Sequence, residues 1–209
     1  QLISKCGIQH DGGTRDNGIK HYNYSKEYII WSVEKSLKDL QTDYLDLLLL
    51  HRPSPLMHPT EIAAAVSILK ETGKIIEFGV SNFTPSQFNL IDQTTSISVN
   101  QIEFSLTQYS AMHNGILDQL LQKEVIPMSW SPLGSYFKET NAANKRIKKV
   151  LDVFTKKYNA TEDQLLLAWI LKHPSGVIPV VGTTSKVRLQ NAVKALDIEL
   201  DLEDWFTLL

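Results

Sequence analysis

Cysteine is nearly absent from this sequence. Cys6 is the only one among 209 residues, so neither a disulfide within the chain nor a cysteine-based zinc cluster is possible. Long apolar runs are also missing, because residues 47–50 and 177–181 fall far short of the roughly 20 residues needed to span a bilayer. No segment has the pattern of a secretory signal peptide. These absences favour a cytoplasmic protein.

An excess of charge of one sign is equally absent. The 21 Lys and Arg residues nearly balance the 23 Asp and Glu residues, which leaves a net charge of -2. This balance argues against a basic nucleic-acid surface and against an acidic tail. Hydrophobic residues make up 43% of the chain, enough for one sizeable core. We expect a single domain over residues 1–209, monomeric, with no nucleic-acid or membrane partner and no metal.

The chain alternates short apolar strands with amphipathic helices. Strands are predicted at residues 2–6, 44–50, 74–80, 97–102, 125–130 and 176–181. Helices are predicted to begin after Ser25, at Pro59 and at Thr84-Pro85, and over residues 115–122, 144–157, 162–173, 185–195 and 202–209. Such alternation indicates a parallel sheet in an α/β protein.

Two architectures fit this alternation, an open doubly wound sheet and a closed (β/α)8 TIM barrel. No Gly-rich dinucleotide fingerprint follows the first strand, which weakens the open-sheet alternative. The polar residues of interest also stand at the carboxyl ends of strands, where a barrel has its active site. We therefore favour the barrel.

Five short motifs carry a resemblance to a known family. They are DYLDLLLLHRP at residues 43–53, GVSNF at 79–83, NQ at 100–101, SWSPLG at 129–134 and IPVVGTT at 178–184. In this order they resemble the aldo-keto reductases, in particular the bacterial branch with short substrate loops. The resemblance implies an NADP-dependent (β/α)8 barrel enzyme of which this chain holds only the last six βα units. The two preceding units, with the family's catalytic tyrosine and its aspartate, are expected to be missing.

The resemblance assigns catalytic roles to Lys5 and His51. A lysine at this position lies beside the family's tyrosine and favours its ionised form. The histidine orients and polarises the substrate carbonyl, which a neutral imidazole can do through one N–H. A solvated strand-end lysine and a structural histidine are the alternatives. Tyr22 and Tyr24 follow the first predicted strand of this chain, whereas the family's catalytic tyrosine is expected before it. Neither residue is therefore assigned as the proton donor.

A second group of residues resembles the family's nicotinamide site. Ser81, Asn82 and Gln101 match the side chains that hold the carboxamide, whose acceptor and donors they complement. Trp130 stands where the family places an aromatic ring against the nicotinamide. The alternatives are a helix-capping turn for Ser81-Asn82 and a core position for Trp130.

A third group resembles the phosphate and adenosine sites. After Trp130, the segment Ser131, Pro132, Leu133, Gly134 and Ser135 is expected to receive the pyrophosphate. Free N–H groups and the helix dipole favour a phosphate at Gly182, Thr183, Thr184 and Ser185. Lys186 and Arg188 would hold the 2′-phosphate, and Asn191 follows on the same helix. An ordinary N-cap before a surface helix is the alternative. Many members have a lysine where Gly182 stands, which leaves the choice of NADP over NAD open.

The predicted function is NADPH-dependent reduction of aldehydes or ketones to alcohols. The alternatives are an NADPH-binding redox sensor or regulatory subunit with little turnover, and an inactive truncated relative. Another barrel enzyme, a hydrolase or isomerase, fits the ordered motifs less well. Residues 9–24 form the long loop that is expected to influence the choice of substrate.

Overall fold

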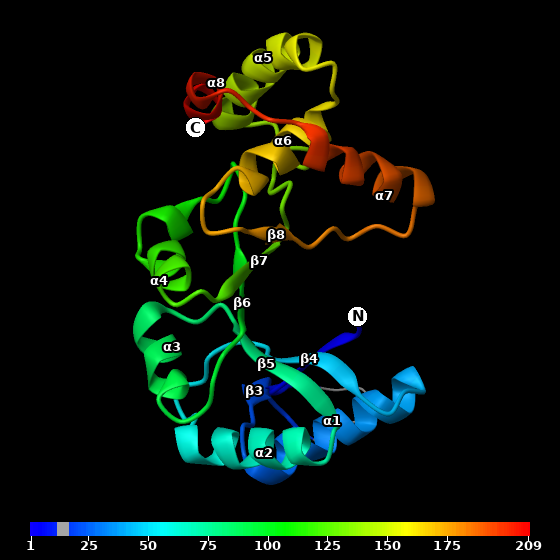
Figure 1. Cartoon of the computed structure of the whole chain (residues 1–209), viewed down its shortest axis with the longest axis vertical. Helices are drawn as coiled ribbons and strands as arrows, with labels where there is room; N and C mark the ends of the chain where they lie inside the picture. The colour runs from blue at the N-terminus through cyan, green and yellow to red at the C-terminus, as the bar shows by residue number, and fades with distance from the viewer. Residues whose placement is uncertain (12–16) are drawn as a thin grey trace. The chain divides into compact units, whose positions relative to one another are not determined.

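The computed structural model describes residues 1–11 and 17–209 (Figure 1). It has an α/β fold with a six-stranded sheet in the order β1-β4-β5-β6-β7-β8 and a two-stranded ribbon, β2-β3. The chain forms two compact units, residues 1–101 and 102–209. We describe each unit by itself, and the expected single domain stays a prediction.

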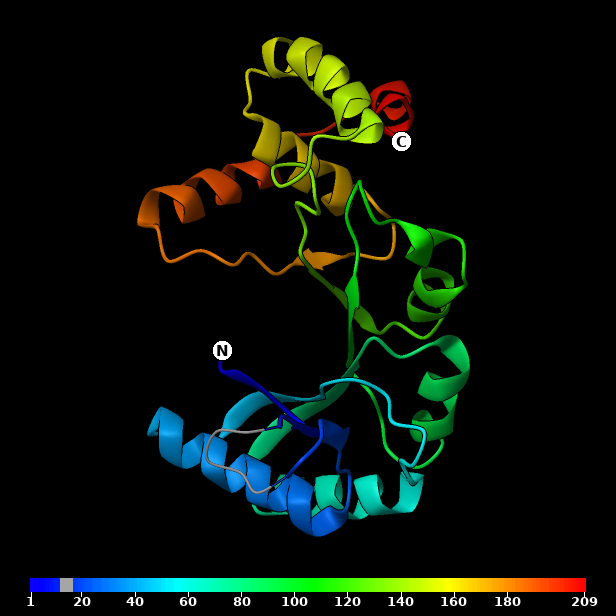
Figure 2. The same ribbon diagram turned by 180° about the vertical axis from the view of Figure 1, so that it is seen from behind.

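The first unit contains strands and helices in alternation. They are β1 (Ile3–Cys6), β2 (Ile8–Gln9), β3 (His21–Tyr22), α1 (Lys26–Leu40), β4 (Leu45–Leu50), α2 (Pro59–Glu71), β5 (Ile75–Ser81), α3 (Pro85–Asp92) and the first part of β6 (Val99–Glu103). Strands β1, β4, β5 and β6 pair in parallel. Figures 1 and 2 show α1 and α2 side by side along one face of these strands.

Sequence-local signals set the helix boundaries in this unit. The Ser25 side chain caps α1 by accepting from the Tyr28 N–H, and Pro59 occupies the first turn of α2. Thr84 and Gln87 form a capping box at the start of α3. The three predicted helix starts are thus confirmed.

The register of the parallel strands separates two faces of the first unit's sheet. Ser4 aligns with Leu48 and Leu48 with Phe78, and the Ser4 hydroxyl hydrogen-bonds Ser36 of α1 at 2.9 Å. This row therefore faces the helices. Lys5 aligns with Leu49, one position on, so its side chain belongs to the opposite face.

The second unit begins within β6 and is richer in helix. Its elements are η1 (Ser110–Met112), α4 (Ile116–Gln122), β7 (Ile126–Trp130), α5 (Ala142–Lys157), α6 (Glu162–Leu171), β8 (Ile178–Pro179), α7 (Lys186–Val193), η2 (Lys194–Asp197) and α8 (Leu202–Leu208). Strands β7 and β8 are parallel. Figure 1 shows α5, α6 and α8 gathered near the C-terminus.

Two tryptophans join α8 to α6 in the core of the second unit. The rings of Trp169 and Trp205 stack with centroids 4.9 Å apart and planes 4° from parallel. Each indole N–H donates to the other residue's carbonyl, at 3.2 Å from Trp169 and 2.9 Å from Trp205. The Arg146 guanidinium donates to the carbonyls of Leu208 and Leu209, which satisfies groups that a helix end leaves unpaired.

The predicted strands and helices are all present, with boundaries that differ by a few residues. The largest difference is β8, where six residues were expected and two pair as a strand. The ribbon of β2 and β3 was not expected, and it interrupts the predicted loop at residues 9–24, part of which (12–16) lies outside the described residues. In the described ranges, no helix combines the length and the apolar character that crossing a bilayer requires.

Candidate functional site

Four polar side chains stand at the carboxyl ends of neighbouring strands in the first unit. Lys5 lies near the end of β1, His51 directly follows β4, Ser81 ends β5 and Gln101 lies in β6. Ser81 pairs in register with Gln101, and the His51 N–H donates to the Cys6 carbonyl at 2.9 Å. Because parallel strands end at the same edge, these residues share one edge of the sheet, as predicted from their positions.

A side-chain contact joins the two outer members of this set. The Lys5 ammonium donates to the Gln101 side-chain carbonyl, although β4 and β5 lie between their strands. Three strand spacings of about 4.8 Å would separate β1 from β6 by roughly 14 Å in a flat sheet. Side chains stand roughly perpendicular to a sheet. The contact therefore indicates that the sheet curls toward this face.

Positive charge is concentrated around Lys5. The residue is exposed overall, but its ammonium group lies against buried Gln101. Burial lowers the pKa of the Lys5 ammonium, and the Arg52 guanidinium lowers it further. The sequence interpretation gave Arg52 no role, and its position next to His51 was the signal that could have pointed to it.

The same environment favours the neutral imidazole of His51. Burial is the largest cause that lowers its pKa, followed by the positive charges of Lys5 and Arg52. His10 and Lys20 add smaller contributions of the same sign. A neutral ring has one N–H donor and one acceptor, so His51 can donate a hydrogen bond to a carbonyl oxygen near neutral pH.

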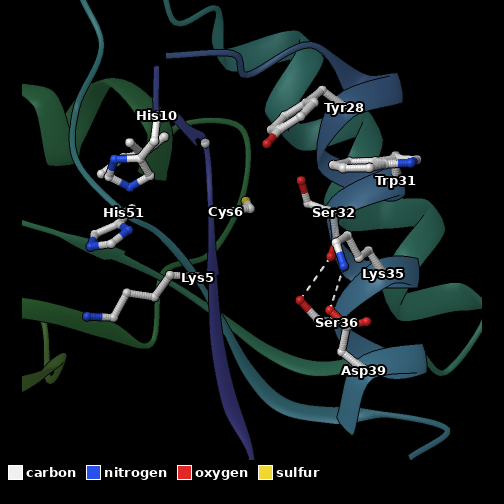
Figure 3. Close-up of a pocket in the computed structure, with 12 residues that line it drawn as sticks. Lys5, Cys6, His10, Tyr28, Trp31, Ser32, Lys35, Ser36, Asp39 and His51 are labelled. Carbon is white, nitrogen blue, oxygen red and sulfur yellow. Dashed lines mark hydrogen bonds and ion pairs between the residues drawn. The ribbon is translucent and has the colours of Figure 1, made fainter. Parts of the chain in front are cut away.

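Lys5 and His51 line a cavity of about 250 Å³ (Figure 3). Figure 3 shows them with His10 on one side of the β1 strand, and polar and aromatic residues of α1 on the other side. The α1 residues are Tyr28, Trp31, Ser32, Lys35, Ser36 and Asp39. Both residues assigned to catalysis thus border one open, mainly polar cavity.

The Ser81 and Asn82 side chains form a local network with the backbone of Gln101. The Ser81 hydroxyl donates to the Gln101 backbone carbonyl at 3.0 Å and accepts from the Asn82 amide at 2.9 Å. Asn82 has a left-handed backbone, with φ 61°, which redirects the chain after β5. The Gln101 amide nitrogen donates to no described residue, so this group can still bind a ligand.

Tyr24 has a structural role in the first unit. Its hydroxyl donates to the Arg52 carbonyl at 2.5 Å, and its ring lies where a Cβ on Gly7 would be, within 2.1 Å of Tyr24 Cε1. Burial is the main cause that raises the pKa of the phenol. A buried, hydrogen-bonded phenol with a raised pKa is poorly suited to act as the proton donor, in agreement with the sequence analysis.

In the second unit, Trp130 ends β7 and the segment from Ser131 to Ser135 follows it. Trp130 is partly exposed, whereas a core position would be buried. The chain turns sharply here, because Ser131 and Gly134 have φ values of 50° and 54°. The Gly134 N–H donates to the Ser131 carbonyl at 2.8 Å, which closes a compact turn. This unit thus presents an aromatic ring next to a tight backbone turn.

The segment from Gly182 to Ser185 leads into α7. Ser185 caps this helix by accepting from the Arg188 N–H at 3.4 Å, while the Ser185 N–H donates to the Thr183 hydroxyl at 3.1 Å. Thr184, Lys186 and Arg188 are exposed. An N-cap is therefore present, which both the phosphate-site prediction and its alternative require, and two cationic side chains lie in the first turn of the helix.

The Asn191 amide is largely engaged within the protein. Its nitrogen donates to Thr161 and Asp163, and its oxygen accepts from Gln164 at 2.8 Å. These bonds tie α7 to the start of α6. One lone pair on the Asn191 oxygen remains, so this side chain can only accept from a ligand.

The part of the chain that the structure describes contains no group of at least three His, Cys, Asp or Glu side chains arranged to hold a metal ion.

Comparisons with known proteins identify the family. The family model described as "Aldo/keto reductase family" matches residues 2–208. The uncharacterized oxidoreductase YcsN of Bacillus subtilis (strain 168) is 39% identical over 212 residues, which cover 99% of this chain and 71% of that protein. A 6-dehydroglucose reductase of Agrobacterium fabrum (strain C58) is also 39% identical, over 100% of this chain and 71% of its own length.

A solved structure supports the same relationship. A thermostable aldo-keto reductase, crystallised with the inhibitor epalrestat, has a TM-score of 0.81 and 26% sequence identity. The match covers 88% of this chain and 66% of that protein, so the chain spans about two thirds of the solved relative. The ordered motifs, the parallel sheet with polar strand ends and the match over residues 2–208 agree: this chain belongs to the aldo/keto reductase family of oxidoreductases.

Proposed function

We propose that the protein is an NADPH-dependent reductase that converts small aldehydes or ketones to alcohols. The observation that carries this proposal is the convergence of Lys5, His51 and Gln101 at one edge of the first unit's sheet, bordered by a polar cavity. Family membership supports a carbonyl as the substrate class. The cofactor and the individual residue roles are part of the proposal.

The donor set of the first unit suits a nicotinamide carboxamide. That group has one acceptor oxygen and two N–H donors. The Gln101 amide nitrogen, which donates to no described residue, would donate to the oxygen. The Ser81 hydroxyl bonds the Gln101 backbone carbonyl and accepts from the Asn82 amide, so these groups stand at the same strand ends. When bound, the cofactor would supply a hydride to the carbonyl carbon. The second unit, taken by itself, would supply the Trp130 ring for aromatic stacking and two segments that suit phosphates.

The cofactor's phosphates match the chemistry of the second unit. The turn at Ser131, Pro132, Leu133, Gly134 and Ser135 would receive the pyrophosphate. The segment Gly182, Thr183, Thr184 and Ser185 opens α7, whose first N–H groups favour an anion. Lys186 and Arg188 would pair with the 2′-phosphate, and this charge supports NADP over NAD. Asn191 would accept from the adenine amine.

Two side chains of the first unit would act on the carbonyl. The neutral His51 imidazole would donate a hydrogen bond to the oxygen and polarise the bond. The Lys5 ammonium would stabilise negative charge that develops there, and it would favour ionisation of a proton-donating group placed beside it. Arg52 strengthens the positive potential at this strand edge.

We further propose that the six strands belong to a (β/α)8 barrel. The strand order follows the order along the chain without reversal, β1-β4-β5-β6-β7-β8. A doubly wound sheet reverses its order at a switch point, whereas a barrel does not. The curl indicated by the Lys5–Gln101 contact supports the same choice.

Steady-state NADPH oxidation by the purified protein tests this function. The carbonyl substrates should include a simple aldehyde and 6-dehydroglucose, which the Agrobacterium relative's name indicates. We expect many turnovers per enzyme and a lower KM for NADPH than for NADH. NADPH binding without repeated turnover would refute the reductase and favour a sensor or regulatory role.

A further inference from the structure

The turn that follows Trp130 is unusual in its backbone. Ser131 adopts φ 50°, a left-handed conformation that is unfavourable for a residue with a side chain. The N–H groups of Ser131 and Leu133 donate to no residue in the described ranges, whereas those of Gly134 and Tyr136 close the turn. A strained turn with unpaired donors needs contacts from outside the turn to hold its shape.

One such contact is the hydroxyl of Thr107. It accepts a hydrogen bond from the Ser135 N–H at 2.9 Å, across 28 residues of sequence. Thr107 is itself fixed by a tight turn in which Ser105 and Gln108 exchange backbone hydrogen bonds of 3.0 and 3.1 Å. The Ser105 hydroxyl lies 3.3 Å from that of Thr107. The acceptor for Ser135 is therefore held in place before any ligand binds.

The contact is also close in a steric sense. A Cβ on Gly134 would lie 1.9 Å from the Thr107 hydroxyl oxygen and 2.5 Å from that of Ser105. Since Gly134 also has a positive φ of 54°, no other residue fits here without displacing the Thr107 turn. Gly134 and Thr107 thus fit one another as a pair.

The Ser135 carbonyl accepts a hydrogen bond from a side chain of α5. The buried Asn144 amide donates to the Ser135 carbonyl at 3.2 Å and to the Glu139 carbonyl at 2.9 Å. The Asn144 backbone N–H is in turn bonded to the Asn141 cap at 2.8 Å. Ser135 is thereby fixed at both its N–H and its carbonyl, by residues distant from it in sequence or on a different element.

We propose that Thr107 is a positioning residue that presets the turn from Ser131 to Ser135 for a pyrophosphate, an inference that rests on the proposed function. Its hydroxyl accepts a hydrogen bond from the Ser135 N–H and so holds the backbone around Gly134 in place. The N–H groups of Ser131 and Leu133 then remain as donors for the anion. Preorganised backbone donors bind an anion more tightly because they need no rearrangement.

Thr107→Val removes the hydroxyl and keeps the branched shape, whereas Thr107→Ser keeps the hydroxyl. We expect Thr107→Val to raise the Kd for NADPH about fivefold to tenfold, the effect of one net hydrogen bond. The Kd for adenosine 2′-monophosphate, which lacks the pyrophosphate, should not change. At saturating NADPH, kcat should stay within about twofold, and Thr107→Ser should restore the wild-type Kd within about twofold.

Thr155→Val is the matched control, because among the described residues the Thr155 hydroxyl bonds only the Asp152 carbonyl of its own helix, at 3.4 Å. Calorimetric titration measures the affinities of each protein for NADPH and for adenosine 2′-monophosphate, and circular dichroism checks folding. Should Thr107→Val fail to fold, Thr107→Ala tests the same hydroxyl. Equal NADPH affinity for the Val, Ser and wild-type proteins overturns the inference, as does an equal loss for adenosine 2′-monophosphate. Failure of the wild-type protein to bind NADPH instead refutes the proposed function.

Discussion

Replacement of Lys5 by methionine tests the charge arrangement at the strand edge. The substitution keeps an unbranched side chain of similar length and removes the ammonium group. We expect kcat for carbonyl reduction to fall by about 10²–10⁴, the typical contribution of a positioned acid-base group. The Kd for NADPH should rise by no more than about fivefold. Among the described residues the ammonium loses one contact, the partly buried bond to Gln101, and solvent reduces its net value to about 1 kcal/mol.

The same variant should change the titration of His51. Burial lowers the pKa of His51 most, and the Lys5 charge is the next largest cause. Removing that charge raises the pKa, so the imidazole becomes protonated at a higher pH than in the wild type. If the reaction needs neutral His51, the acidic limb of the kcat/KM profile shifts toward neutral pH. Proton NMR of the His51 ring measures the pKa directly.

Lys26→Met is the control for this experiment. Lys26 is a partly exposed lysine at the start of α1 whose ammonium pairs with Glu27 at 3.4 Å. Its replacement should leave both kcat and the pKa of His51 unchanged. A normal kcat in Lys5→Met would exclude Lys5 from the chemistry. An unchanged pKa of His51 would show that the proposed charge coupling is wrong.

The wild-type protein should also respond to acid through His51. A histidine whose folded-state pKa is lowered contributes stability above its unfolded pKa of about 6.5, because the unfolded state binds the proton more readily. That contribution is lost as the pH falls through the folded-state pKa. Urea unfolding of the wild type and of His51→Gln across this pH range measures the difference, which should disappear in the variant.

Further predictions concern the second unit. Trp205→Phe should lower the free energy of unfolding by about 2 kcal/mol, because the Trp169 carbonyl loses its donor and the ring becomes smaller. Phe206→Leu, at an exposed position, should lower it by less than about 0.5 kcal/mol, and equal values in urea unfolding would contradict this packing. Arg188→Ala should weaken NADPH binding by about 1.5–3 kcal/mol and NADH binding less, and equal losses in titrations would exclude contact with the 2′-phosphate. Trp130→Ala should weaken NADPH binding by roughly 1 kcal/mol and remove part of the fluorescence quenching, and unchanged quenching would rule out stacking.

Much of the fold could be predicted because its signals are local. Helical spacing of apolar residues and the caps at Ser25 and Thr84 depend on neighbours within four residues. Apolar runs such as Leu45–Leu50 indicate buried strands without any knowledge of their partners. The β2–β3 ribbon was missed because each strand has only two residues, too few to show a period.

The candidate site was only partly predictable, for a related reason. The positions of Lys5, His51, Ser81 and Gln101 at strand ends follow from the pattern of the chain. Their contacts do not. The sequence analysis placed Asn191 with the cofactor-binding residues, and only the packing of α7 on α6 shows that most of its hydrogen-bonding groups are engaged.

The sequence by itself determined the alternation of elements, the edge of the sheet at which polar residues collect, and the family's motifs. These depend on periodicity and on short segments in which every informative neighbour is close along the chain. The tertiary structure alone decided that Lys5 meets Gln101, 96 residues away, and that Thr107 holds the Ser135 N–H. Such contacts depend on strand order, sheet curvature and side-chain packing. Those properties arise from many weak interactions between distant segments, which no single stretch of sequence specifies.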